Sequence, residues 1–123
     1  MCGRFVLSNF TDVKEFHNVL IEPSYNIAPS HCTLILNQEM RPDFLEWGYS
    51  PIWAKKPMNL INAKYESLDI KPSFKDYETC VFVADGWFEW QKNSRGEKHP
   101  IFIHANNEIF YFAGIKNASG AAI

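Results

Sequence analysis

The second residue of the chain offers two reactive groups once the initiator methionine is removed. Cys2 has a small side chain, which permits that removal, and the mature chain would then begin with a thiol and a free α-amine on one residue. An α-amine has a pKa of about 7.7–8.0, so part of it is neutral and nucleophilic at pH 7. Such an aminothiol condenses with an aldehyde to an imine, and the thiol then closes a five-membered thiazolidine. The alternative is that Cys2 is an ordinary residue at a frayed terminus.

Three further residues suit chemistry beside this aminothiol. Gly3 lacks a side chain, which allows the backbone of another molecule to approach closely. Arg4 is expected on the same strand face as Cys2, where its planar guanidinium can hold a phosphate. Glu89 supplies a carboxylate for the proton transfers of imine formation. The competing interpretation of Glu89 is an exposed strand residue whose aromatic neighbours lie on the opposite face.

A loop between prolines combines aromatic and basic side chains. Trp53 lies in the expected loop 48–57, where a large aromatic side chain can stack on a nucleic-acid base. The candidate basic track consists of Arg4, Lys55, Lys56, Lys64 and Lys71. The other three tryptophans, Trp47, Trp87 and Trp90, are expected in the core. A net charge of −2 neither requires nor excludes a nucleic-acid partner, because a local basic groove can exist on an acidic protein.

Composition excludes several classes of protein. The 123 residues are 46% hydrophobic and 21% charged, which excludes a disordered tail. The sequence holds neither a run of roughly 20 apolar residues nor a signal peptide, so we expect a cytoplasmic protein without a membrane partner. Its 3 cysteines form no C-x-x-C pair and lie near no histidine cluster. We therefore expect no disulfide framework, no metal site and no cofactor.

The elements that must position these residues are mostly strands. Strands are expected at residues 1–7, 32–36, 43–47, 79–84, 86–91, 100–105 and 108–113. A helix of about ten residues is expected to begin at an N-cap Thr11 and to end before Pro23. Residues 25–29 are expected to form a loop, residues 73–77 a helical turn, and Asn106-Asn107 a tight hairpin. The predicted fold is α+β, a predominantly antiparallel or mixed, curled and barrel-like sheet with one or two short helices.

Five sequence blocks in this order resemble those of the SOS response-associated peptidase (SRAP) family. The blocks are Met1-Cys2-Gly3-Arg4-Phe5, Tyr25-Asn26-Ile27-Ala28-Pro29, Trp47-Gly48-Tyr49-Ser50-Pro51, Ile61-Asn62-Ala63-Lys64-Tyr65-Glu66 and Ala84-Asp85-Gly86-Trp87-Phe88-Glu89-Trp90. The resemblance implies a DNA-damage response protein that binds single-stranded DNA and forms a thiazolidine crosslink with abasic sites. It also implies a cysteine autopeptidase that removes Met1, with a lyase-like crosslinking activity.

The resemblance further implies roles for individual residues. Cys2 would be the nucleophile, Asn62 would hydrogen-bond the reacting sugar, and Glu89 would move protons. The implied DNA contacts are Gly3, Arg4, Asn26, Trp53, Lys55, Lys64 and Lys71. Lys64 stands where the family motif often has arginine, so the bidentate grip on a phosphate is lost there.

One departure concerns the far end of the chain. Members of the family usually continue into a His-x-Arg-Met-Pro-like block that assists Schiff-base chemistry, whereas this sequence stops at Ile123. The histidines His99 and His104 match no such block. We therefore expect residues 1–123 to be the N-terminal portion of a single SRAP domain, with crosslinking impaired by the missing part.

Two other functions remain open at this point. An N-terminal-nucleophile amidohydrolase would use the Cys2 thiol on an amide, with its own amine as the base. A remnant of an SRAP domain would bind single-stranded DNA without any chemistry. Incubation with abasic single-stranded DNA, compared with a simple amide substrate, separates the crosslinking protein from the amidohydrolase.

Overall fold

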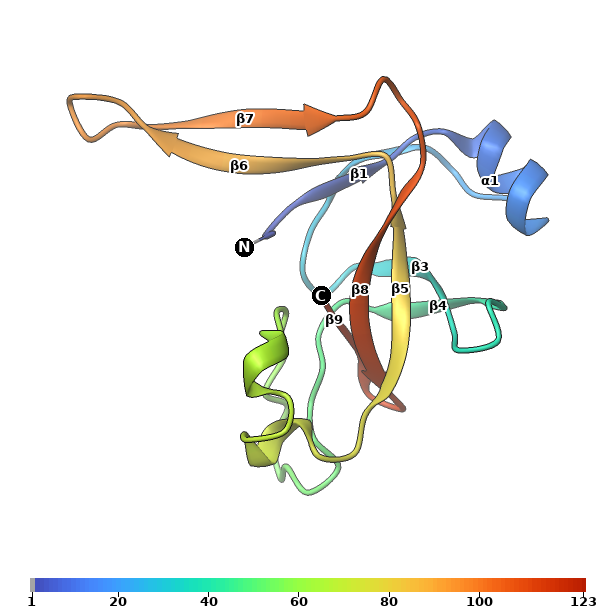
Figure 1. Cartoon of the computed structure of the whole chain (residues 1–123), viewed down its shortest axis with the longest axis vertical. Coiled ribbons are helices and arrows are strands. Elements are labelled where there is room, and N and C mark those ends of the chain that lie inside the picture. The colour runs from blue at the N-terminus through green and yellow to red at the C-terminus, as the bar shows by residue number, and fades with distance from the viewer. Residues whose placement is uncertain (1) are drawn as a thin grey trace. The chain divides into compact units, whose positions relative to one another are not determined.

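The computed structural model describes residues 2–123, which form two compact units (Figure 1). Unit 1 combines the described residues up to Ala28 with Ala84–Phe110. Unit 2 combines Pro29–Val83 with Tyr111–Ile123. Each unit therefore draws on two separate stretches of the sequence, and each is described on its own below.

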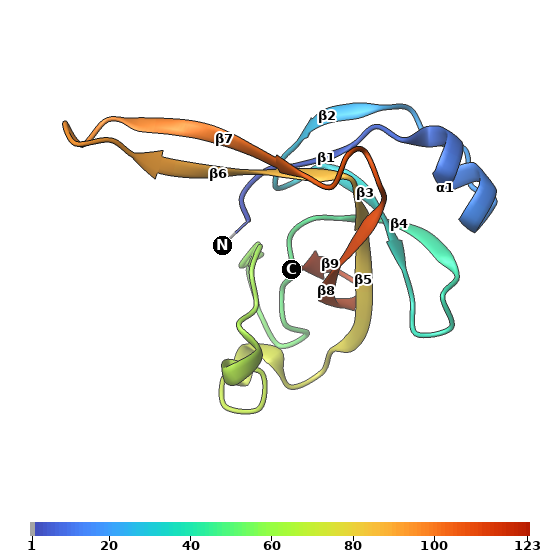
Figure 2. The same ribbon diagram turned by 45° about the horizontal axis from the view of Figure 1, so that its top comes forward.

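Unit 1 contains a four-stranded sheet in the order β2-β1-β6-β7. Its strands are β1 (Phe5–Leu7), β2 (Ser24–Ile27), β6 (Gly86–Lys92) and β7 (Lys98–His104). Every neighbouring pair is antiparallel, and Phe5 of β1 lies opposite both Ile27 and Trp87. Strands β6 and β7 form a long hairpin, and β2 runs beside β1 (Figures 1 and 2). Strand β7 is the outer strand on its side of this sheet.

Helix α1 (Phe10–His17) follows β1 directly. It begins two residues earlier than an N-cap at Thr11 would require, because the Asn9 side chain caps it by accepting from the Asp12 N–H at 3.1 Å. Asparagine is at least as good an N-cap as threonine, so the prediction of Thr11 was wrong. The helix ends at Asn18, whose φ of 54° is left-handed, a conformation that asparagine tolerates. Val13 is the buried side chain of the helix.

A buried carboxylate ties the start of this helix to the sheet. Asp85 is 2% exposed, and its Oδ2 accepts from the backbone N–H groups of Ser8 at 2.7 Å and Asn9 at 2.6 Å. The Asp85 N–H in turn donates to the carbonyl of Val6 at 2.8 Å. Next to it, a Cβ on Gly86 would lie 2.3 Å from the Phe102 ring, so only glycine lets β7 approach this closely.

Unit 2 is built around a five-stranded sheet in the order β4-β3-β5-β8-β9. Its strands are β3 (Cys32–Leu36), β4 (Pro42–Glu46), β5 (Glu78–Ala84), β8 (Phe110–Asn117) and β9 (Gly120–Ala122). The ends Ala84 and Phe110 fall in unit 1. Strands β5 and β8 run side by side in both views (Figures 1 and 2). Trp47 and Phe82 are fully buried and meet edge to face at 6.2 Å between ring centroids.

Between β4 and β5 the chain is mostly irregular. Residues 48–57 form the expected loop, followed by two 3₁₀ turns, η1 (Tyr65–Ser67) and η2 (Pro72–Phe74). Phe74 in η2 is buried, and its ring lies 5.9 Å from that of Tyr49. The predicted helical turn at 73–77 is therefore a 3₁₀ turn that begins one residue earlier.

The α+β class, with mostly antiparallel sheets and one short α-helix, is confirmed. The strand at 32–36 has the expected bounds, and the other strands differ by a few residues at their ends. The helical segments within residues 2–123 are all too short or too polar to serve as a membrane span.

Besides the N-cap, four predictions of local structure were wrong. Residues 25–27 belong to β2 rather than to a loop, and the first strand starts at Phe5, so Cys2, Gly3 and Arg4 precede it. Met1 lies outside the described residues. Asn106 and Asn107 have the expected positive φ, but they lead from β7 into a strand of the other sheet instead of closing a hairpin. Trp90 is 57% exposed and lies outside the core, because it stands toward the β6–β7 turn, where residues 90–100 are all exposed.

Replacing Asp85 with alanine would leave the Ser8 and Asn9 N–H groups without their buried acceptor. We expect the Asp85→Ala variant to lose about 2–4 kcal/mol in the free energy of unfolding, as measured by urea denaturation. The matched control is Asp69→Ala, which removes an exposed carboxylate and should change stability by less than about 0.5 kcal/mol. Equal stability of the two variants would contradict the anchoring role of Asp85.

Candidate functional site

Cys2 is a buried residue that precedes an open position at Gly3. Cys2 is 7% exposed, and its thiol lies 3.5 Å from the carbonyl oxygen of Arg4, to which it donates. The chain bends at Gly3, just before β1. A Cβ built on Gly3 would meet no atom outside residues 2–4 within 4 Å, so Gly3 leaves open space on its own side of the chain.

Burial raises the pKa of the Cys2 thiol above its ordinary value. A backbone hydrogen bond at Arg4 acts in the opposite direction, and the negative charge of Glu89 adds to the increase. The thiol is therefore protonated at neutral pH, and a base must take its proton before the sulfur attacks. The influence of Glu89 on this pKa places its carboxylate within electrostatic range of the sulfur.

Arg4 and Asn26 meet across the β1–β2 pair. The Arg4 Nη1 donates to the Asn26 Oδ1 at 2.8 Å, and both residues are exposed. On the other side of Arg4, its carbonyl accepts from the N–H of Phe88 in β6 at 3.0 Å. The Arg4 guanidinium is thus held at the surface by Asn26, and its other N–H groups can donate to an anion.

Glu89 stands on β6, opposite Ile101 of β7, and its side chain is half-buried. Because neighbouring residues of a strand point to opposite faces, Glu89 and Trp90 lie on different faces of the sheet. Unit 1 contains five of the predicted site residues, Cys2, Gly3, Arg4, Asn26 and Glu89, on or next to the paired strands β1, β2 and β6.

The other predicted site residues belong to unit 2. Asn62 lies between two residues whose backbone groups are hydrogen-bonded: the Ile61 carbonyl accepts from the Trp47 indole at 2.8 Å, and the Ala63 N–H donates to Ile123 at 2.7 Å. The N–H of Ile123 also donates to Ile61 at 3.0 Å. These contacts fix the backbone on both sides of Asn62, whose side chain is half-buried.

The Trp53 side chain is exposed, but a hydrogen bond fixes its orientation. Its side chain is 57% exposed, and its indole N–H donates to the carbonyl of Pro72 in η2 at 3.3 Å. One edge of the ring is thereby attached to the 3₁₀ turn, while much of the ring remains open to solvent. A ring held in this way suits stacking on a base.

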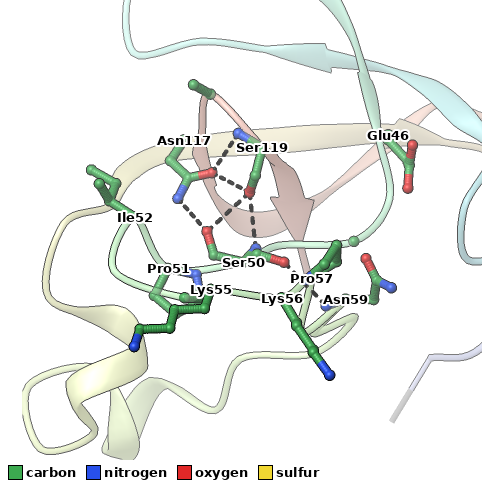
Figure 3. Close-up of a pocket in the computed structure, with 13 residues that line it drawn as sticks. Glu46, Ser50, Pro51, Ile52, Lys55, Lys56, Pro57, Asn59, Asn117 and Ser119 are labelled. Carbon is green, nitrogen blue, oxygen red and sulfur yellow. Dashed lines mark hydrogen bonds between the residues drawn. The ribbon is translucent and has the colours of Figure 1, made fainter.

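The predicted lysines all follow Trp53 in the chain. Lys55 and Lys56 help line a pocket of about 520 Å³, and their side chains extend away from its hydrogen-bonded wall (Figure 3). Lys64 and Lys71 are exposed and immediately precede the two 3₁₀ turns, so Lys71 is next to the residue that accepts from Trp53. The roles of all these residues toward DNA stay predictions.

Sequence reasoning missed the polar residues that hold this pocket. Asn117 at the end of β8 and Ser119 in the turn that follows hydrogen-bond to Ser50 in the loop, 67 and 69 residues away. The available signal was the Asn-Ala-Ser-Gly run at 117–120, whose residue types favour a tight turn. Among residues 2–123, no group of three or more metal-ligating side chains gathers at one place.

Curated proteins with similar sequences process abasic sites, according to their names. The chain is 38% identical over 133 residues to the abasic site processing protein YoqW of Bacillus subtilis, and the match covers 94% of this chain and 59% of YoqW. The abasic site processing protein YedK of Escherichia coli is 34% identical, with coverage of 94% and 59%. The mouse abasic site processing protein HMCES is 27% identical, over 67% of this chain and 30% of HMCES. The chain thus spans 59% of the length of the bacterial relatives.

Solved structures share the fold. A phage-related protein from Bordetella bronchiseptica superposes with a TM-score of 0.72 at 27% identity, covering 98% of this chain and 67% of that protein. A protein from Bacteroides thetaiotaomicron gives a TM-score of 0.67 at 21% identity, over 94% of this chain and 56% of that protein.

The family model for SOS response associated peptidase (SRAP) matches residues 1–121, which is nearly the whole chain. The match includes all five blocks singled out in the sequence, from the Cys2 block to the Glu89 block. The chain therefore belongs to the SRAP family.

Proposed function

We propose that this protein binds single-stranded DNA and joins itself covalently to abasic sites through Cys2. The observation that carries the proposal is the setting of Cys2: a buried thiol with open space at Gly3 and a carboxylate, Glu89, within electrostatic range. The names of the relatives YoqW and YedK, both abasic site processing proteins, support the same substrate.

The reaction begins with hydrolysis of the Met1–Cys2 peptide bond, which frees the α-amine of Cys2. The neutral amine adds to the aldehyde carbon of the ring-opened deoxyribose, and loss of one water molecule gives an imine. The thiol then adds to the same carbon: a carbon–sulfur bond forms, and the proton released from sulfur ends on nitrogen. The product is a thiazolidine, and its formation consumes one aldehyde and releases one water.

Glu89 is the proposed proton carrier for these steps. The raised pKa of Cys2 means that the thiol needs a base during ring closure, and water loss from the first adduct needs an acid. Asn62 is proposed to orient the sugar aldehyde by hydrogen bonding, and the bonds on either side of it limit its movement. Arg4 and Asn26 are proposed to hold a phosphate next to the abasic site.

Once Met1 has been removed, the setting of Cys2 favours this reaction over hydrolysis of an amide in another molecule. A cysteine that attacks an amide is activated by a lowered pKa, whereas burial and Glu89 raise the pKa of Cys2. Imine formation depends first on the amine, so a protonated thiol does not hinder the initial step.

The first prediction concerns the N-terminus. A variant with an uncleavable extra residue before Cys2 has no α-amine at that position, and its thiol can form only a reversible hemithioacetal. We expect it to bind abasic single-stranded DNA without a stable adduct, while the processed chain gains the mass of the oligonucleotide minus water. Intact mass spectrometry under denaturing conditions measures this, with an oligonucleotide lacking the abasic site as control. Equal crosslinking by the blocked variant would exclude the thiazolidine, and binding without an adduct by the processed chain would indicate a remnant without chemistry.

The second prediction concerns affinity. The binding constant for single-stranded DNA should fall as the salt concentration rises. A plot of its logarithm against the logarithm of the salt concentration should have a negative slope, of about 0.7 for each phosphate neutralised. Trp53→Ala should weaken binding by about 1–3 kcal/mol if one base stacks on this ring. Trp90→Ala is the matched control, because Trp90 is equally exposed at 57% and lies in unit 1. Fluorescence anisotropy with a labelled oligonucleotide measures both effects. Equal losses in the two variants, or an affinity independent of salt, would contradict the proposed DNA contacts.

The third prediction separates chemistry from binding. Glu89→Gln keeps the shape of the side chain but cannot carry a proton, so adduct formation should slow by about 10²–10⁴-fold while DNA affinity changes little. The defect should shrink as pH rises toward the raised pKa of Cys2, because the thiol then ionises without help. Asn62→Ala should slow the reaction without altering its dependence on pH.

Time courses of crosslinking at several pH values measure these rates. Glu108→Gln is the control, since Glu108 is an exposed carboxylate outside the proposed site. A normal rate for Glu89→Gln from pH 5 to 8 would remove Glu89 from the mechanism.

A further inference from the structure

The loop that carries Trp53 and Lys55 is closed at its base by one serine. The backbones of Tyr49 and Leu60 exchange two hydrogen bonds of 2.8 Å, which bring the two ends of the loop together. Next to this pair, the Ser50 Oγ accepts from the N–H of Met58 at 2.8 Å and from that of Asn59 at 3.2 Å. Ser50 therefore joins the start of the loop to its end.

Ser50 is itself held by the turn between β8 and β9 (Figure 3). The Ser50 carbonyl accepts from the Asn117 Nδ2 at 2.7 Å and from the Ser119 Oγ at 3.0 Å. The Ser50 N–H donates to the same Ser119 Oγ at 2.9 Å. Both backbone groups of Ser50 are thus bonded to side chains of this turn.

The turn between β8 and β9 is itself fixed in position. The Asn117 Oδ1 accepts from the Ser119 N–H at 2.8 Å and from the Ser119 Oγ at 2.5 Å, so the two residues that hold Ser50 are fixed to each other. A Cβ on Gly120 would lie 2.3 Å from the carbonyl oxygen of Gly48, so the turn touches the chain just before the loop, at a distance only glycine permits. The turn between β8 and β9 therefore contacts the residues on both sides of Tyr49, which are Gly48 and Ser50.

Among the described residues, few other hydrogen bonds restrain the tip of the loop. The Ala54 N–H donates to the Pro51 carbonyl at 3.0 Å, and the Trp53 indole donates to Pro72 at 3.3 Å. The side chains of Lys55 and Lys56 are exposed. A loop ordered only upon binding loses conformational entropy at that moment, whereas one ordered beforehand does not.

We propose that Ser119 and Asn117 are positioning residues, which act through Ser50 to hold residues 51–57 in the conformation that presents Trp53 and Lys55 to single-stranded DNA. The proposal rests on the proposed function for its ligand. It assigns a role to a turn that lies outside all five family blocks. The two residues need not touch DNA, since their effect passes through the backbone of Ser50.

The test compares Ser119→Ala with Ser119→Thr, which restores the hydroxyl, and with Ser94→Ala, an exposed serine in the β6–β7 turn of unit 1. Hydrogen exchange of the segment 51–60 should be faster in Ser119→Ala alone, at the Met58 and Asn59 amides above all. Limited trypsin cleavage after Lys55 should also be faster in this variant. Melting temperatures control for a general loss of stability.

Binding to an abasic single-stranded oligonucleotide supplies the functional readout. We expect Ser119→Ala to weaken binding by about 2- to 10-fold, as the loss of one or two hydrogen bonds implies, and Ser119→Thr to restore it. Because Ser119 acts through the loop, Ser119→Ala and Trp53→Ala together should cost less than the product of their separate effects.

The possible outcomes distinguish the positioning role of Ser119 from the proposed function. Unchanged exchange, or faster exchange with unchanged affinity, would overturn the positioning role while the proposed function stands. The positioning role would also be overturned if the affinity lost on combining Ser119→Ala with Trp53→Ala equalled the product of the two separate losses. If the wild-type chain bound no single-stranded DNA, the proposed function would fail, and the exchange and cleavage data would then decide alone whether Ser119 holds the loop.

Discussion

The carboxylate of Asp85 is the interaction on which the candidate centre in unit 1 depends. It accepts from two consecutive backbone N–H groups, at the point where β1 ends and helix α1 begins. A buried carboxylate is tolerated only when it is hydrogen-bonded, so this charge fixes one backbone path for Ser8 and Asn9. The path fixes β1, and the pairing of β1 with β2 and β6 gives Cys2, Arg4 and Glu89 their neighbours. A change at Asp85 would therefore disturb the Cys2 centre without touching it.

Much of the fold was predictable because the relevant signals are local. The apolar run at 32–36 predicted β3, and alternation predicted β5 and β6 to within a residue. Where the prediction failed, a contact with residues far away in the sequence determines the local structure. Residues 25–27 read as a loop between prolines, yet β2 forms because β1 offers its edge to them. Strand β9 has only small residues, and it exists because Gly120 allows contact with Gly48.

In the candidate site, too, local sequence patterns were informative, whereas contacts between distant residues were not predictable. The five blocks gave the residue types and the family, and hence the positions of Cys2, Asn62 and Glu89. They did not give the contact between Arg4 and Asn26, which depends on the register of two strands, nor the bond from Trp53 to Pro72. Ser119 illustrates the limit. Its bond to Ser50 joins residues 69 apart, and no local pattern in the sequence marks such a pair.

Strand β7 has a consequence for the behaviour of the protein in concentrated solution. As the outer strand of its sheet it presents a free row of backbone groups, together with the exposed side chains of Ile101 and Phe102. Such an edge invites another strand to pair with it, which is a route to aggregation. Pro100 stands in the middle of this strand and has no N–H to offer, and Lys98 adds a positive charge at its start. An incoming strand would thus meet a gap in the hydrogen-bond ladder and a charge repelling its own copy, so the edge carries its own protection against self-association.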